Sequence, residues 1–240
     1  KLTVSENGRF LCFEDGTPFF WLGDTGWLLG MHLNREEAEH YLNVRKDQGF
    51  NVVQMMLMWN YPVVNAYGQY FNSDFESYES IDRKDPGVYG YWDHIDYIVE
   101  LAEKRGIYMA LLPTWGRVVN KGLFTEEKAS AYARFLALRY KDKPNIIWIN
   151  GGDVDASIKM DIWHTIGETL KKYDPNHLVT FHPRGLRTSA TWFHNSSWLD
   201  FHMFQTGHRR YGQSYGPNKE YSGDFHEEDG WRFVAQAQTL

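Results

Sequence analysis

A carboxylate follows one of the apolar runs of the sequence. Residues 145–153 read NIIWINGGD, so an apolar run ends on two glycines and then on Asp153. Such a run is typical of a parallel strand covered on both faces, and the glycines let the chain turn sharply where the carboxylate is presented. A carboxyl group displayed in this way can transfer protons as a general acid or base.

Two interpretations of Asp153 are open from the sequence. Ile147, Trp148 and Ile149 would give the carboxyl group an apolar frame, which favours its protonated form near neutral pH. Alternatively, Asp153 or Asp155 only caps the helix that follows, a common role for an aspartate after a strand, and Asp155 is the better placed of the two for capping.

Polar or aromatic side chains also follow the other strand-like runs. The guanidinium of Arg184 or Arg209 suits a sugar-acid carboxylate, although either arginine equally suits an ion pair within its own loop. For Asp24 the alternative role is to fix its loop, and for the histidines it is packing in a satisfied site. We expect the following residues to bind substrate: Asp24, Trp59, Trp115, His182, Arg184, Gln205 and His208.

This combination of groups suits the cleavage of glycosidic bonds. Such bonds are usually cleaved by two carboxylates, one protonating the leaving group and the other acting as nucleophile or base. Aromatic residues make up 17% of the chain, and the segment 59–91 is rich in them among Asn, Ser, Asp and Gly. Flat amphipathic rings suit the apolar faces of sugars, although such rings also fill cores. We therefore expect the segment 59–91 to form a binding wall.

The elements that position these residues alternate between strands and helices. Asn34 can cap the first long helix, with Glu37 as its capping-box partner and Gly49 at its end. Helical runs between successive strands imply crossover connections and a parallel sheet. The strand-like runs are 19–26, 51–59, 107–115, 145–153, 177–185 and 199–208, and the later helical runs are 92–105, 125–141, 157–173 and 228–240, with a poorly helical segment after the fifth strand.

A parallel sheet of this kind is either doubly wound or closed into a barrel. Polar and aromatic residues at the end of every strand favour an α/β fold of the (β/α)8 TIM-type barrel class, because an open sheet concentrates its site at one switch point. A complete barrel takes about 250 residues and eight strands, whereas only about six βα units are found here. We expect residues 1–240 to form one catalytic barrel domain, C-terminally incomplete and part of a longer protein. Completion of the six units by another chain is the alternative. The longer protein is favoured, because an open barrel would leave unpaired strand edges and an uncovered core.

Composition excludes several classes of partner. The formal charge of −6 and the absence of basic clusters beyond short pairs argue against nucleic acid, and no apolar run is long enough to span a membrane. Phosphate-binding GxGxxG and P-loop motifs and the GxSxG elbow are absent, and His164 with Glu168 lacks a third metal ligand, so we expect no cofactor and no metal. The chain starts at Lys1 rather than Met, which fits a mature secreted or periplasmic protein after signal removal.

Several longer motifs together resemble the apiosidase-like glycoside hydrolases. These motifs are RFLCFEDGTPFFWLGDTGW, GFNVVQ, NIIWINGGD, TFHPRG and MFQTGHRRY, and the resemblance thins after Tyr211. The resemblance implies a (β/α)8 fold, apiose on a pectic backbone as the sugar, and Asp153 as the acid/base. It also implies a nucleophilic Glu in a DGEP-like motif after the seventh strand, and this sequence contains no such motif.

We therefore expect a retaining glycoside hydrolase that acts on an oligosaccharide or polysaccharide of plant-type, pectic or related, glycans. Its nucleophile would lie outside the given residues. Among the given residues, Asp24 and the acidic residues 227–229 are less suited to be the nucleophile. Asp24 fits substrate binding or loop fixing better, and residues 227–229 fit the first turn of the predicted last helix. The alternative is a non-catalytic carbohydrate-binding protein of barrel descent that lacks the second carboxylate. The first hypothesis predicts turnover and the second only binding.

Overall fold

A five-stranded parallel sheet forms the centre of the molecule. The computed structural model describes residues 1–206 and residue 235. The strands are β3 (Gly23–Thr25), β4 (Val52–Met56), β7 (Tyr108–Leu112), β8 (Ile146–Val154) and β9 (Val179–Pro183), and they neighbour one another in this order. Spatial order follows chain order without a reversal, which is the winding of a barrel and not of a doubly wound sheet. The fold is thus a partial (β/α)8 barrel.

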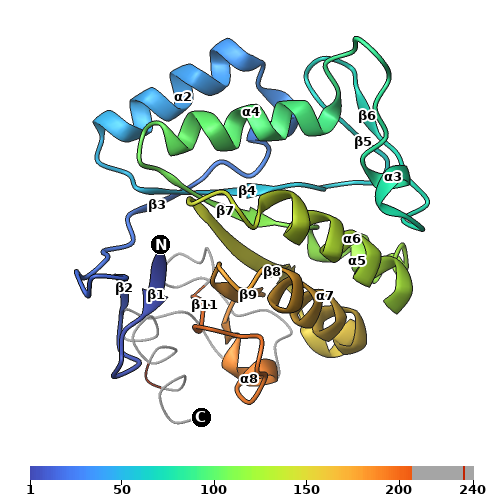
Figure 1. Ribbon diagram of the computed structural model, residues 1–240. Helices are drawn as coiled ribbons and strands as arrows, with labels where there is room; N and C mark the ends of the chain where they lie inside the picture. Colours follow the sequence, from blue (N-terminus) through green and yellow to red (C-terminus); the bar gives the residue numbers. More distant parts are fainter. Residues whose placement is uncertain (207–234, 236–240) are drawn as a thin grey trace, which may run out of the picture.

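Four long helices lie along the outer face of this curved sheet (Figure 1). They are α2 (Arg35–Asp47), α4 (Tyr91–Glu103), α6 (Glu126–Tyr140) and α7 (Met160–Tyr173). The predicted capping box of α2 is confirmed. The Asn34 side chain accepts a hydrogen bond from the Glu37 N–H, and the Glu37 carboxylate accepts one from the Asn34 N–H, each at 2.9 Å. Local sequence signals therefore place the start of this helix correctly.

The remaining strands and helices are short. An N-terminal antiparallel hairpin of β1 and β2 and a second hairpin of β5 and β6 were not predicted from the sequence. No helix in the described part of the chain combines the length and apolar character needed to cross a membrane. The short elements are β1 (Leu2–Val4), β2 (Leu11–Phe13), α1 (Leu29–His32), β5 (Val63–Val64), β6 (Tyr70–Phe71), α3 (Tyr78–Ile81), α5 (Gly116–Asn120), the 3-10 helix η1 (Ala156–Lys159), β10 (Arg187–Thr188), α8 (Ala190–Phe193) and β11 (Phe204–Gln205).

The sixth predicted strand differs from expectation. In the described part of the run 199–208, only β11 is a strand, and it pairs antiparallel with β10. The run does begin beside β9, because the Asp200 N–H donates to the Val179 carbonyl at 2.8 Å. However, the Val179 N–H donates to the Asp200 carboxylate at 2.7 Å. A side chain, and not a backbone carbonyl, therefore accepts this hydrogen bond. The predicted helical run 228–240 lies outside the described residues, apart from residue 235.

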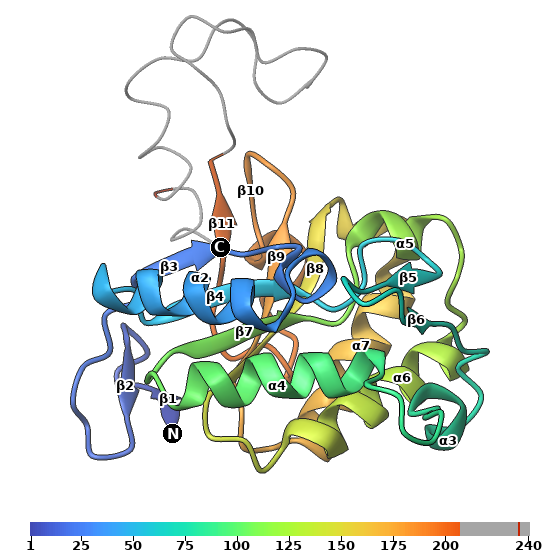
Figure 2. The same ribbon diagram turned by 90° about the horizontal axis from the view of Figure 1, so that it is seen from above.

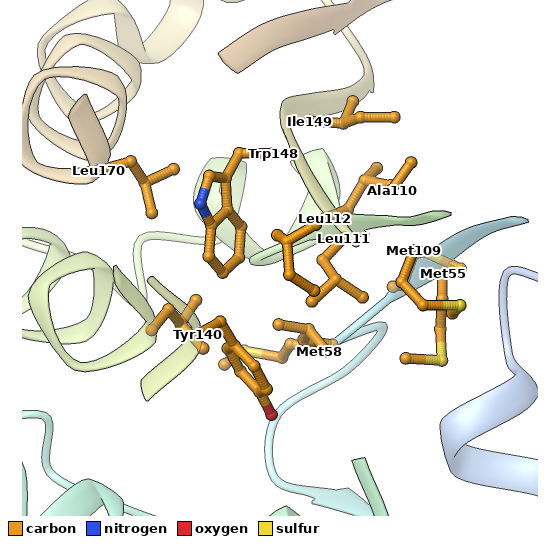
Figure 3. Packing of buried hydrophobic residues seen from close by; sticks show 14 of the residues in the cluster. Met55, Met58, Met109, Ala110, Leu111, Leu112, Tyr140, Trp148, Ile149 and Leu170 are labelled. Carbon is orange, nitrogen blue, oxygen red and sulfur yellow. The ribbon is translucent and has the colours of Figure 1, made fainter. Parts of the chain in front are cut away.

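The core lies between the sheet and the outer helices. Figure 3 shows Trp148 of β8 and Leu112 of β7 packed with Tyr140 of α6 and Leu170 of α7. All four side chains have 0% exposure. Burial of each large apolar side chain contributes about 1.5–3 kcal/mol, which explains why these strands are continuously apolar.

The aromatic segment 59–91 is only in part a surface wall. Phe71, Phe75 and Tyr91 are 1–4% exposed, and Phe71 stacks on Tyr132 of α6 with ring centroids 5.9 Å apart. These three rings therefore belong to the core, which corrects the expectation for them. Exposed rings of the same segment are Tyr67, Tyr70 and Tyr78.

Candidate active site

Strand β8 ends in a bulge that carries Asp153. Gly151 pairs with His182 of β9, but the next pair is Val154 with Pro183, so Gly152 and Asp153 have no ladder partners. The φ angles of these residues are +92° at Gly151, +123° at Gly152 and +58° at Asp153. Positive φ is uncommon outside glycine, although aspartate tolerates it better than most residues. The bulge turns the carboxylate away from the packed sheet, and Asp153 is exposed.

The two glycines are required by close packing as well as by backbone angle. A Cβ atom on Gly151 would lie 2.6 Å from the His182 carbonyl oxygen. On Gly152 it would lie 2.7 Å from the ring of Trp115. The GGD sequence therefore allows neighbouring strand ends to approach the bulge, in addition to the sharp turn that the sequence predicted for these glycines.

Asp153, His182 and Gln205 are brought together at this end of the sheet. The Asp153 backbone N–H donates to His182 Nδ1 at 3.2 Å, and the Gln205 side-chain amide donates to Asp153 Oδ1 at 3.2 Å. The same Gln205 amide donates to the Pro183 carbonyl at 3.0 Å, which fixes its position. Within residues 1–206, no hydrogen bond is made to Asp153 Oδ2. Figure 2 shows β9, which carries His182, lying between β8 and β11. Strand β8 carries Asp153, and β11 carries Gln205.

The expected apolar frame does not enclose the Asp153 carboxyl group. Ile147, Trp148 and Ile149 are fully buried within β8, and the Trp148 indole donates to Asp174 at the opposite end of the strand. Asp153 lies beyond the bulge and is exposed. Its surroundings are instead polar groups and the aromatic rings that follow the neighbouring strands.

The His182 ring packs against two tryptophans that also contact each other. Ring centroids are 5.6 Å from Trp27 and 5.6 Å from Trp115. Burial lowers the pKa of His182 below its ordinary value, and the nearby charge of Asp153 opposes this effect without cancelling it. The ring is therefore neutral near neutral pH. Because Nδ1 accepts a hydrogen bond, the proton of the neutral ring sits on Nε2.

Three tryptophans form a cluster beside Asp153. Trp115 is 5.4 Å from Trp27 and 5.7 Å from Trp59, measured between ring centroids, and all three rings are partly exposed. Arg117 lies over the Trp59 ring at 3.9 Å and donates to the Trp59 carbonyl at 3.1 Å. Sequence reasoning selected Trp59 and Trp115 but missed Trp27. The sequence feature that could have identified Trp27 is its position directly after the predicted strand 19–26, in the run GDTGW.

Asp24 makes its contacts with helix α2. Its carboxylate accepts hydrogen bonds from the Tyr41 hydroxyl at 2.7 Å and from the Arg45 guanidinium. Partial burial works against ionisation, yet the bonds from Tyr41 and Arg45 keep the pKa of Asp24 below its ordinary value. In the described chain no hydrogen bond links Asp24 to Asp153, His182 or Gln205. These contacts match the loop-fixing alternative and give no support to substrate binding by Asp24.

Arg184 and Asp155 tie down the loop that follows the site. Arg184 Nε lies 3.6 Å from Asp155 Oδ2. Asp155 Oδ1 accepts hydrogen bonds from the Ser157 N–H at 3.1 Å and the Ser157 hydroxyl at 2.6 Å, so the prediction that Asp155 is the cap is confirmed. This contact joins the loop after β9 to the loop after β8, so it differs from the ion pair within its own loop that the sequence left open, and substrate binding by Arg184 stays a prediction. The predicted residues His208 and Arg209 lie outside the described residues.

The arrangement can protonate or deprotonate a group held against flat rings. Asp153 supplies the acid, the Gln205 amide and His182 Nε2–H supply donors, and the tryptophans supply apolar faces. Within residues 1–206, no hydrogen bond joins a second carboxyl group to Asp153, His182 or Gln205. Across the same residues, no group of three or more His, Cys, Asp or Glu side chains could hold a metal ion.

Comparisons with known proteins agree with this architecture. Residues 5–239 match the model of the apiosidase-like catalytic domain. A solved structure named glycoside hydrolase is 51% identical, with a TM-score of 0.93, over 100% of this chain and 54% of its own. A glycoside hydrolase family 5 structure from Bacteroides vulgatus is 50% identical, with a TM-score of 0.93, over 100% of this chain and 51% of its own. The chain thus spans about half the length of these two structures.

A more distant structure supports the fold alone. The endo-1,4-beta-mannanase from Rhizomucor miehei is 18% identical, with a TM-score of 0.56, over 76% of this chain and 61% of its own. No curated protein matches the chain. Because the family model covers nearly all of the sequence, the chain belongs to the family of apiosidase-like catalytic domains.

Proposed function

We propose that the protein is a retaining glycoside hydrolase in which Asp153 is the general acid/base. The observation that carries this proposal is the bulge of β8, which presents an exposed carboxylate, with an Oδ2 that none of residues 1–206 engages, beside the tryptophan cluster. Membership of the apiosidase-like family supports the reaction class. The two structures about 50% identical are named glycoside hydrolases, which agrees with it.

The residues have distinct roles in the proposed reaction. Asp153 gives its proton to the glycosidic oxygen as the bond to the anomeric carbon breaks, while a second carboxylate attacks that carbon. Asp153 then removes a proton from water, and the resulting hydroxide oxygen releases the sugar from the second carboxylate. The second carboxylate would come from a part of the protein outside the described residues. Gln205 would hold Asp153, and the tryptophans would stack on sugar faces.

The substrate we propose is a pectic or related plant-type glycan. Support comes from the family, whose name refers to apiose, and from the flat rings beside the acid. An extracytoplasmic location is part of the same proposal, because polymeric glycans of this kind lie outside cells. Product analysis on a panel of pectic and hemicellulosic oligosaccharides tests the substrate, and cell fractionation tests the location.

The variant Asp153→Asn tests the acid/base role in the protein that contains this chain. We expect hydrolysis of natural oligosaccharides to fall by about 10²–10⁴, the usual contribution of general acid–base catalysis. Aryl glycosides with good leaving groups should lose less at the first step, because their departure needs little protonation. Asp155→Asn is the matched control, since it keeps the cap acceptor two residues away. Unchanged turnover of a natural oligosaccharide by Asp153→Asn would reject the assignment.

A carbohydrate-binding protein without turnover is the alternative. The clustered, partly exposed tryptophans favour sugar binding under either hypothesis. Binding of an oligosaccharide without any product, in protein that includes the second carboxylate, would support the alternative and reject the hydrolase.

A further inference from the structure

We propose that His182 is a positioning residue, which holds Asp153 in its left-handed backbone conformation by accepting the Asp153 N–H at Nδ1. The unprotonated ring makes this bond, and protonation of the ring releases it. The inference rests on the proposed function only for its kinetic consequence, since the bond itself is a property of the fold.

The Asp153 backbone needs an external partner. A non-glycine residue at a φ of +58° is strained by about 1–3 kcal/mol and persists only where its surroundings enforce it. In the bulge, the Asp153 N–H has lost its ladder partner on β9. His182 Nδ1 takes the place of that partner at 3.2 Å. The histidine side chain therefore satisfies the one backbone donor that the bulge releases at the reacting residue.

The His182 ring is itself held firmly. It lies against the faces and edges of Trp27 and Trp115, and its backbone pairs with Gly151 in the β8–β9 ladder. A ring fixed in this way can impose a backbone conformation on its partner. Asp153 is then held at two points, at its N–H by His182 and at Oδ1 by Gln205, which leaves Oδ2 to act.

Protonation of His182 removes its acceptor. A protonated ring carries a hydrogen on Nδ1, which would point at the Asp153 N–H, so that two donors would face each other. Among the groups around the ring, Asp153 of β8 is charged, and Trp27 and Trp115 are not. Arg184, which directly follows β9, is paired with Asp155.

The direction of the pH effect follows from the lowered pKa of His182. The unfolded chain takes up the proton near pH 6.5, whereas the folded protein takes it up at lower pH. The stability linked to the neutral ring is thus fully present above the pKa of His182 in the unfolded chain. It is lost as pH falls through the pKa of His182 in the folded protein. The hydrogen bond from the Asp153 N–H to His182 Nδ1 should be lost as the folded protein takes up this proton. Its loss would contribute to the fall of the hydrolysis rate at acidic pH.

Two variants separate positioning from general packing. Asn at position 182 places its side-chain oxygen close to where Nδ1 lies and cannot be protonated at mild pH, whereas Leu has no acceptor. We expect His182→Leu to lower kcat by about 10²-fold, the scale of a misplaced catalytic group. His182→Asn should recover most of kcat and flatten the acidic limb, while KM rises because the Nε2–H donor is lost. Equal loss of kcat in the two folded variants would overturn the inference.

Nuclear magnetic resonance tests the bond without any need for activity. We expect ring ¹⁵N shifts of His182 to show the Nε2-protonated tautomer, and the Asp153 amide resonance to shift with the His182 titration between about pH 4 and 8. His194→Asn, an exposed histidine stacked on His202, is the control and should leave that titration unchanged. An Asp153 amide that ignores the His182 titration would overturn the inference. If the coupling is present but no glycoside is hydrolysed, the proposed function fails and the positioning role stands.

Discussion

Two aspartate–histidine pairs lie at opposite ends of strands β8 and β9, and they differ in how fully their polar atoms are satisfied. At the N-terminal end, Asp174 and His177 are 0% and 6% exposed, with Asp174 Oδ2 2.6 Å from His177 Nδ1. The Trp148 indole donates to the same oxygen at 2.7 Å. At the C-terminal end, Asp153 is exposed, and none of residues 1–206 donates a hydrogen bond to its Oδ2.

The difference shows how identical residue types take opposite roles. Asp174 has both oxygens engaged, since the Asn176 N–H donates to Oδ1 at 3.2 Å, and its full burial keeps ligands away from it. Asp153 sits on a strained bulge and has one oxygen to spare. In barrels, the N-terminal face serves stability and the C-terminal face serves chemistry, and the role proposed for Asp153 agrees with that division.

The largest effect is expected at the buried pair. Asp174→Ala should reduce the free energy of unfolding by about 3–5 kcal/mol, because it leaves the Trp148 indole N–H and the His177 ring buried without their partner. Chemical denaturation followed by circular dichroism measures the loss. Asp174→Asn keeps an acceptor for Trp148 and should cost less. A loss below about 1 kcal/mol for Asp174→Ala would mean that the two pairs do not differ in the way described.

Close packing at the bulge gives the next effect. Gly151→Ala should cost about 2–4 kcal/mol, because its φ is +92° and the new methyl group would lie 2.6 Å from the His182 carbonyl oxygen. Gly49→Ala is a matched control with a φ of +87° and no atom within 4 Å of the new methyl group. The control should cost only about 1 kcal/mol. Equal losses in thermal denaturation would remove the steric argument for the GGD sequence.

The tryptophan cluster should affect binding more than stability. Trp59→Ala is expected to weaken oligosaccharide binding by about 1–3 kcal/mol, the scale of one lost aromatic contact, with little change in melting temperature. Trp163→Ala, at a ring with 0% exposure, should instead cost about 3–5 kcal/mol of stability. Titration calorimetry and thermal denaturation of both variants check this. A large fall in melting temperature for Trp59→Ala with unchanged affinity would place its ring in the core.

The smallest effect on stability is expected at Asp153 itself. Asp153→Gly relieves the positive φ but adds backbone freedom to the unfolded chain, so the free energy of unfolding should change by less than about 1 kcal/mol. Hydrolysis of natural glycans should nevertheless be lost. Denaturation and activity assays on one preparation test both statements. A destabilisation comparable to that of Asp174→Ala would show that Asp153 is a structural residue.

Local signals were reliable guides in this molecule. The capping box of α2, the cap at Asp155 and the glycine turn before Asp153 were all predicted from residues only a few positions apart. Such features depend on short-range hydrogen bonds and backbone angles, which neighbouring residues decide by themselves.

Long-range partners account for the differences from expectation. Asp24 follows a strand as a site residue would, but Arg45 and Tyr41 of α2 engage its carboxylate. Phe71 looks like a loop ring in the sequence, but Tyr132 of α6 stacks on it in the core. Neither partner can be identified from spacing, because each depends on how the helices pack against the sheet.

The sequence by itself determined the parallel βα order, the helix starts and the turn that exposes Asp153, since periodicity and local backbone preferences encode these directly. Only the tertiary structure decided which groups surround that carboxylate. His182 and Gln205 are 29 and 52 positions away along the chain, and Trp27 joins the cluster only because the strands that precede these residues end at the same edge of the sheet. Strand register sets these neighbours, and register is a property of the folded sheet as a whole.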